Sequence, residues 1–119
     1  MAGRVAPAAD TGLSRHDLAA LRWVLLEQRA FRREQLRRIR HAPPREGSGW
    51  RLSALDEVQD CLAMGARIVL ADVEAALARI DTGHYGRCSH CRQAIGLARL
   101  RICPQTSYCA ECHRVREQG

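Results

Sequence analysis

The sequence contains no lysine, few aromatic side chains and no long apolar run. All 19 positions that hold Lys or Arg are arginines. A base-stacking surface for single-stranded nucleic acid needs clustered aromatic side chains, and their scarcity argues against one. No stretch approaches the ~18 apolar residues of a membrane span. Arg4 has no continuous apolar run behind it, which argues against a secretory signal. The aromatic residues are Trp23, Phe31, Trp50, Tyr85 and Tyr108.

Six cysteines in a chain without a secretory signal favour metal ligands over disulfides. A length of 119 residues allows one ordinary domain, or an elongated element with a small module. The sequence has no G-x-S-x-G motif and no glycine-rich phosphate loop. We expect His16, His41 and His84 to be surface histidines. The prediction is a cytoplasmic, basic metalloprotein that is not an enzyme and has no catalytic residue.

The net charge of +6 is unevenly distributed. Residues 14–46 carry nine arginines against four acidic residues, a net charge of +5, whereas residues 52–82 carry −4 and residues 83–119 carry +4. A solvated surface with cross-helix ion pairs explains this pattern. Binding to nucleic acid, or to an acidic protein channel, explains it as well. An all-arginine composition can follow from a GC-rich genome, so it is weak evidence for phosphate binding.

The first long segment has the pattern of an amphipathic helix. Residues 1–13 lack periodicity, and we expect a disordered tail there. Ser14 is placed as an N-cap with Asp17 in the capping-box position. Pro43 and Pro44 end the helix. Its apolar stripe begins with Leu18, Leu21 and Leu25.

The second long segment has a more regular apolar stripe. Ser53, with Asp56 three residues later, is the expected N-cap, and Gly83 is the expected C-terminal cap. Gly65 is the one weak helix former inside it, at a cost of about 1 kcal/mol relative to Ala. Spacings of three and four residues fit the helical period. The stripe is Leu55, Val58, Leu62, Ala66, Val69, Val73, Leu77 and Ile80.

Two long helices joined by a short loop form an antiparallel hairpin. We predict a mainly α fold: a coiled-coil hairpin over residues 14–82, with its tip at about 42–52, followed by a small zinc module over 83–119 with a short C-terminal helix. The expected neighbours near the tip are Leu36 and Ile39 with Leu55 and Val58. At the base they are Leu18 and Leu21 with Leu77 and Ile80.

Two C-x-x-C pairs give the most specific signal in the chain. Cys88 and Cys91 are followed, after 17 residues, by Cys109 and Cys112. Two such pairs indicate a tetrahedral Zn²⁺ site, because a two-residue gap lets both thiolates of a pair turn toward one ion. Four protein ligands leave no open position for water. We therefore predict one structural zinc ion and no other cofactor.

Other metal-binding side chains lie near these pairs. His90, His113 and Cys103 are alternative ligands, but either histidine would break a C-x-x-C turn, and Cys103 precedes a proline. We expect both histidines to be exposed and Cys103 to be packed. Cys61 is expected to be a structural or partly exposed thiol on the second helix. A thiol-switch role for Cys61 or Cys103 stays open.

The segment around the cysteines resembles the C4 zinc finger of the DksA/TraR family. The resemblance extends from the four cysteines to Tyr85-Gly86-Arg87, Ile95-Gly96, Arg99-Leu100 and Pro104, and the preceding hairpin is similar to the family's coiled coil. The resemblance implies a regulator that binds RNA polymerase directly. It also implies that the coiled coil enters the secondary channel to modulate initiation. Several family members act together with guanosine tetraphosphate.

The chain departs from the family pattern at three places. Its tip carries Glu46 as the only acid where better-characterised members have an aspartate pair. Arg92 stands where a glycine often follows the first C-x-x-C, and the C-terminal helix is short. We therefore do not extend the binding of guanosine tetraphosphate from the family to this chain. Arg45 and Trp50 are the candidate contacts at the tip. We expect a monomer. The alternatives are an Arg-rich zinc protein that binds nucleic acid and a zinc-stapled protein–protein adaptor.

Overall fold

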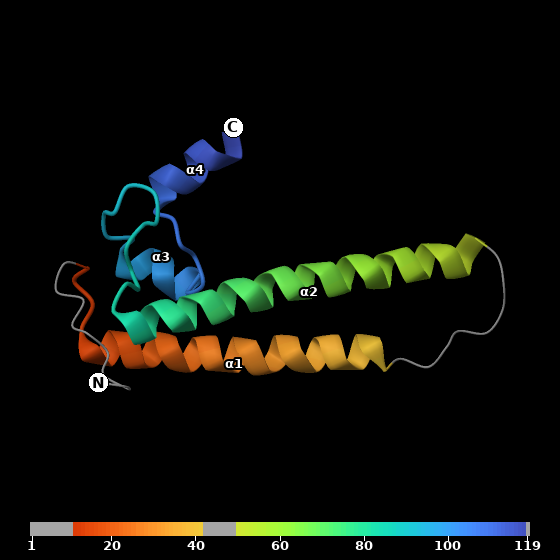
Figure 1. Cartoon of the computed structure of the whole chain (residues 1–119). Helices are drawn as coiled ribbons and strands as arrows, with labels where there is room; N and C mark the ends of the chain where they lie inside the picture. Colours follow the sequence, from red (N-terminus) through yellow and green to blue (C-terminus); the bar gives the residue numbers. More distant parts are fainter. Residues whose placement is uncertain (1–10, 42–49, 119) are drawn as a thin grey trace.

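The computed structural model describes residues 11–41 and 50–118, including their side chains except those of residues 50–53. Two long antiparallel helices, α1 (Arg15–Arg40) and α2 (Trp50–Thr82), form a hairpin (Figure 1). Two short helices follow, α3 (Leu97–Ile102) and α4 (Ala110–Gln118). Within the described part, Arg87 and Ala94 form an isolated β-bridge. The mainly α fold, with a hairpin followed by a four-cysteine module, confirms the predicted fold class. No described helix is long and apolar enough to cross a membrane.

The start of α1 is fixed by the predicted capping box. The Ser14 hydroxyl accepts a hydrogen bond from the Asp17 backbone N–H, and the Asp17 carboxylate accepts one from the Ser14 N–H, each at 3.0 Å. The bond from the Ser14 backbone also lowers the pKa of the Asp17 carboxyl. Two donors that would otherwise lack partners at the helix start are thereby satisfied.

Helix α2 begins earlier than predicted and ends where predicted. It starts at Trp50, so Ser53 lies inside the helix and the expected N-cap there is wrong. No Gly or Pro separates these two positions, and nothing in the sequence between them stops the helix. At the other end, Gly83 adopts φ +78° and its N–H donates to the Ile80 carbonyl at 3.2 Å. With the His84 N–H on the Arg79 carbonyl, this forms a Schellman cap.

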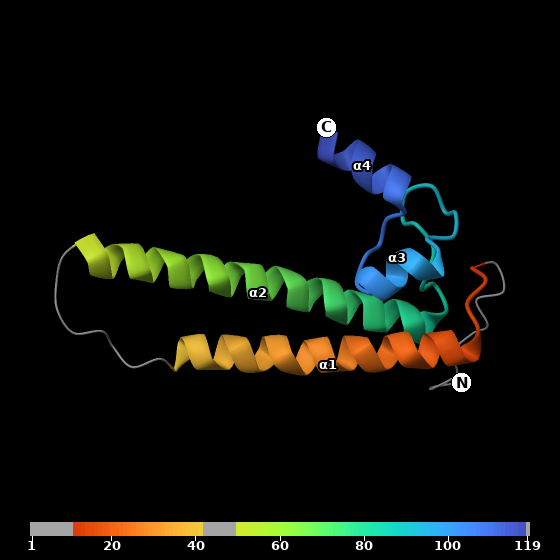
Figure 2. The ribbon, with the colours of Figure 1, turned by 180° about the vertical axis from the view of Figure 1, so that it is seen from behind.

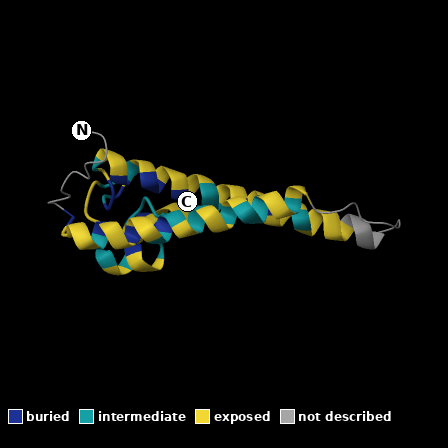
Figure 3. Cartoon of the chain, turned by 90° about the horizontal axis from the view of Figure 1, so that it is seen from below, coloured by how far each residue is buried: buried dark blue, intermediate teal, exposed yellow. Residues whose placement is uncertain are grey.

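The hydrophobic core lies at the end of the hairpin that carries the finger. Burial is concentrated there and thins along the helices (Figure 3). The predicted base neighbours share this core, which confirms their pairing. Because α3 contributes to it, the finger and the hairpin form one packed unit. The buried members are Leu13, Leu18, Leu21, Leu25, Val73, Ala76, Leu77, Ile80, Tyr85 and Leu100.

The predicted pairing near the tip is wrong. Leu55 and Val58 are 49% and 56% exposed, while Leu36 and Ile39 line a cavity with Ala63. The reason is a mismatch in helix length, because α1 has 26 residues and α2 has 33. With the register fixed by the core at the base, α2 continues beyond the end of α1 (Figure 1).

The predicted disordered tail over residues 1–13 is too long at its C-terminal end. Thr11 and Leu13 are buried, and Leu13 joins the core. They pack against Gly86, where an added Cβ would lie 2.9 Å from the Leu13 Cδ1 atom and where φ is +89°. The segment over residues 11–13 is too short to show a periodic pattern, so the sequence did not indicate this contact. Residues 1–10 lie outside the described part of the chain.

Candidate metal centre

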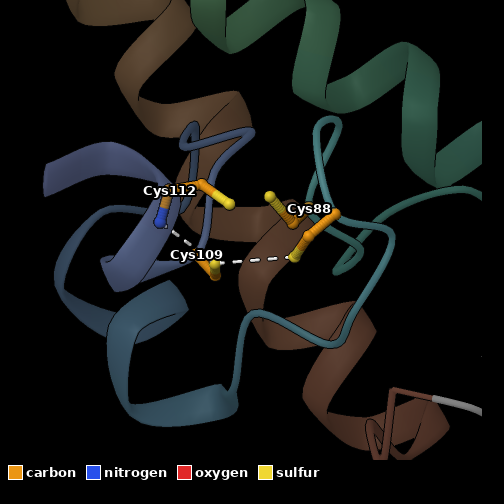
Figure 4. A group of neighbouring side chains, drawn as sticks. Cys88, Cys109 and Cys112 are labelled. Carbon is orange, nitrogen blue, oxygen red and sulfur yellow. Dashed lines mark hydrogen bonds between the residues drawn. The ribbon is translucent and has the colours of Figure 1, made fainter. Parts of the chain in front are cut away.

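The four cysteines of the two C-x-x-C pairs come together in space. The sulfur atoms of Cys88, Cys91, Cys109 and Cys112 all lie within 4.8 Å of one another, and Cys88 and Cys112 are buried. Figure 4 shows three of these side chains turned toward a common centre. Four thiol donors in one cluster fit the tetrahedral coordination of Zn²⁺. The arrangement suits one structural zinc ion, as predicted.

The first cysteine pair lies in a tight turn held by backbone hydrogen bonds. The Cys88 N–H donates to the Gln93 carbonyl at 2.8 Å, and the Arg92 N–H donates to the Cys88 carbonyl at 3.0 Å. Arg92 has φ +66°, the left-handed conformation that favours glycine. The sequence position that departs from the family pattern is thus also the strained position of the turn.

The second cysteine pair lies at the start of α4. The Cys112 N–H donates to the Cys109 sulfur at 3.4 Å, which orients that sulfur into the cluster. The His113 N–H donates to the Cys109 carbonyl at 2.9 Å and continues the helix. The two pairs are joined by a bond of 2.8 Å from the Ser89 N–H to the Ser107 carbonyl. Both halves of the cluster are therefore held by backbone geometry.

Two arginines hold the segment that leads into the second pair. Arg79 of α2 donates to the carbonyls of Gln105 and Thr106 at 3.4 and 3.3 Å. Arg99 of α3 donates to the Tyr108 carbonyl at 3.0 Å. Burial lowers the pKa of Arg79. Sequence reasoning assigned no role to either arginine. Arg99 lies in the motif that carries the family resemblance, whereas no sequence signal marks Arg79.

The cysteine thiols of the cluster differ in their pKa values. Burial raises the pKa of Cys88, but backbone donors at Cys91, Cys109 and His90 outweigh it and bring that pKa to about 6. Burial and the neighbouring sulfurs raise the pKa of Cys112 to about 12. One thiolate is thus favoured, whereas four together require a cation, which is the electrostatic demand that a zinc ion satisfies.

The alternative ligands lie away from the four-sulfur cluster. His90 and His113 are exposed, as predicted, and His113 lies 2.9 Å from the Glu117 carboxylate. Cys103 is half-buried and lines a cleft of about 450 Å³ between α2 and α4. Cys61 is exposed on α2. Arg45 lies outside the described residues, and for Trp50 only the backbone is described, so their roles at the tip stay predictions.

Similar proteins were found for the finger and for the whole fold. Residues 83–118 match the family described as "Prokaryotic dksA/traR C4-type zinc finger". Over 57 residues the chain is 37% identical to an uncharacterized protein of Aquifex aeolicus, a match that covers 48% of this chain and 39% of the relative. Over 51 residues it is 33% identical to the RNA polymerase-binding transcription factor DksA of Haemophilus influenzae, covering 43% and 35%. The chain therefore spans well under half the length of these curated relatives.

The structural likeness extends beyond the finger to the hairpin. The structure of transcription factor DksA2 from Pseudomonas aeruginosa matches with a TM-score of 0.66 and 26% identity, covering 88% of this chain and 86% of that one. Seen from behind, the short helices lie at the base of the long hairpin (Figure 2). Fold and site define a C4 zinc-finger protein built on a helical hairpin. Its finger matches the DksA/TraR zinc-finger family over residues 83–118, and the chain as a whole is similar in fold to DksA2.

Proposed function

We propose that this protein is a transcription regulator that binds RNA polymerase directly and modulates initiation by inserting its coiled coil into the secondary channel. The main support is the joint likeness of finger and hairpin to a transcription factor over 88% of the chain. A relative that matches part of the chain is named as binding RNA polymerase. Leu100 and Tyr85 of the finger pack into the hairpin core, which supports the proposal. Because of this packing, a finger docked on polymerase would hold the coiled coil in a fixed orientation.

The zinc ion has a structural role in this proposal. Cys88, Cys91, Cys109 and Cys112 are the four ligands, and together they fill a tetrahedral site. No position is left for a reacting water. The ion supplies folding energy to a module that has little core of its own. We therefore propose a regulatory protein without enzymatic activity, acting as a monomer in the cytoplasm.

The tip of the hairpin sets the sign and size of the regulatory effect. Its residues 42–49 lie outside the described part, and Glu46 is the only acid among them. In this proposal the finger and the helix base contact polymerase as well. We therefore expect a changed tip to weaken binding without abolishing it, and to alter the effect on initiation. We propose that neither polymerase binding nor regulation by this protein requires guanosine tetraphosphate.

The proposal is tested by titrating zinc-loaded protein against core RNA polymerase from its own source. The assay uses physiological salt and excess competitor DNA. We expect saturable binding that persists with DNA and weakens when residues 42–51 are replaced by a Gly-Ser linker of equal length. Binding without tip dependence would contradict channel insertion. Salt-sensitive capture by the DNA alone would favour the nucleic-acid alternative, since released counterions make such binding steeply salt-dependent.

A further inference from the structure

Charged residues recur at intervals of seven along one edge of each long helix. Residues seven apart lie two turns apart on the same face of a helix. On α2 this series is Asp60, Arg67, Glu74 and Asp81, and on α1 it is Arg15, Arg22 and Arg29, with Arg33 and Arg40 on the same face. Such edges of a coiled coil normally pair opposite charges across the two helices.

One ion pair confirms that these two edges adjoin. The Arg33 guanidinium lies 3.3 Å from the Glu74 carboxylate. Farther toward the tip the complementarity is broken, because Arg67 interrupts the acidic series and lines the same cavity as Arg40. Among the described residues, no carboxylate lies within 4.0 Å of either guanidinium. Two exposed arginines from opposite helices therefore line one cavity, and neither has a carboxylate partner in the part of the chain that the structure describes.

The cavity between these arginines has apolar walls. Its volume is about 260 Å³, and Leu36, Ile39 and Ala63 line it together with Arg40 and Arg67. Arginine forks bind a carboxylate bidentately. The apolar walls gain from a hydrocarbon side chain that leaves water. A nucleic-acid backbone offers the anion but no hydrocarbon group for these walls, so a protein segment fits better.

We propose that this cavity, which we name the Arg40–Arg67 cavity, is a docking point for an RNA polymerase segment that presents a carboxylate beside an apolar side chain. The inference rests on the proposed function and adds a contact surface on the shaft of the coiled coil. The carboxylate supplies the anion that the arginine series lacks, and the apolar side chain fills the space beside Ile39. Neither the finger nor the tip takes part in this contact.

The test compares two double variants with equal changes of charge. R40E with R67E places two carboxylates at the cavity, whereas R29E with R38E makes the same change of charge on α1, outside the cavity and away from the helix base. Zinc content and far-ultraviolet circular dichroism establish that both variants fold. Binding to core RNA polymerase is measured for each by fluorescence anisotropy. We expect the affinity of the cavity variant to fall at least tenfold and that of the control to change less than threefold.

The outcomes separate this inference from the function it rests on. If the unmodified protein does not bind polymerase, the proposed function fails first. If it binds and the cavity variant binds equally well, or if both variants lose affinity equally, the docking point is wrong while the function stands. If R40E with R67E loses affinity for a duplex DNA probe but keeps polymerase binding, the occupant is a phosphate and the inference is overturned.

Discussion

The phenolic hydroxyl of Tyr85 donates a hydrogen bond of 2.8 Å to the carbonyl of Pro104. Tyr85 is only 2% exposed, so this bond is buried. This bond joins the end of the hairpin to the segment that precedes the second cysteine pair. A buried carbonyl that loses its donor carries the full cost of leaving water. The bond thus couples the stability of the finger to that of the hairpin base.

Tyr85→Phe should destabilise the zinc-loaded protein by about 1–3 kcal/mol, because it leaves the Pro104 carbonyl unpaired. Denaturant unfolding followed by circular dichroism measures the change. Tyr108→Phe is the matched control, since the Arg116 Cζ atom lies 4.2 Å from the centroid of the Tyr108 ring and the Tyr108 hydroxyl makes no hydrogen bond to a described residue. Equal effects of the two variants would show that the Tyr85 bond has no special weight.

The same tyrosine predicts a loss of stability in base. Burial raises the pKa of Tyr85 above the usual value of about 10. The folded state therefore holds the phenolic proton more tightly than the unfolded chain does. This contribution is complete below pH 10 and declines as the pH rises further. Between pH 9 and pH 11 the free energy of unfolding should fall more for the unmodified protein than for the Tyr85→Phe variant. Parallel curves would contradict the assignment.

Arg92→Gly should stabilise the finger by about 0.5–1 kcal/mol, because glycine adopts a positive φ without strain. Thermal unfolding of the zinc-loaded protein measures it. Gln93→Gly is the neighbouring control at a position without positive φ, and it should destabilise by a similar amount. A decrease in melting temperature for both variants would mean that the left-handed turn carries no strain.

Leu25→Ala should cost about 2–5 kcal/mol, since Leu25 is fully buried in the core at the base. Leu62→Ala should cost less than about 0.5 kcal/mol, because Leu62 is 51% exposed. Urea unfolding of both variants tests whether stability is concentrated beside the finger. A larger loss at Leu62 than at Leu25 would contradict a core concentrated at the base of the hairpin.

Zinc removal should unfold the finger while leaving the long helices largely formed. The module over residues 83–118 depends on the ion for much of its folding energy. After chelation, two-dimensional amide spectra should show loss of dispersion for this segment and shifts at the core residues of α1 and α2 that pack against Tyr85 and Leu100. Retention of dispersed finger signals in a metal-free sample would contradict a structural role for zinc.

The sequence predicts those features that depend on local chemistry. Ser14 with Asp17 fixes the start of α1, Gly83 fixes the end of α2, and the spacing of the cysteines predicts their cluster. The two caps depend on contacts within a few residues of the chain. The cysteine cluster depends on tetrahedral metal coordination, which few arrangements of ligands satisfy. The boundary between the hairpin and the finger, and the assignment of individual zinc ligands, stay predictions.

The features that the sequence did not reveal depend on contacts between distant segments. Leu13 is buried because the finger folds back over it, and Arg79 matters because α2 passes beside the Gln105 carbonyl. The error near the tip has the same origin. An apolar stripe predicts which face of α2 is apolar, but the end of α1 decides how much of that face is covered. Leu55 lies beyond that end.

The most direct test of the account is cross-linking from the coiled coil to polymerase. Cys61 is exposed on α2, outside the four-cysteine cluster, and can carry a photoreactive probe in a Cys103→Ser background. The probe is activated in the complex with core RNA polymerase, and the linked peptides are identified by mass spectrometry. The account predicts cross-links to the walls of the secondary channel that disappear after zinc removal. Cross-links confined to the outer surface of polymerase, or to DNA, would contradict it.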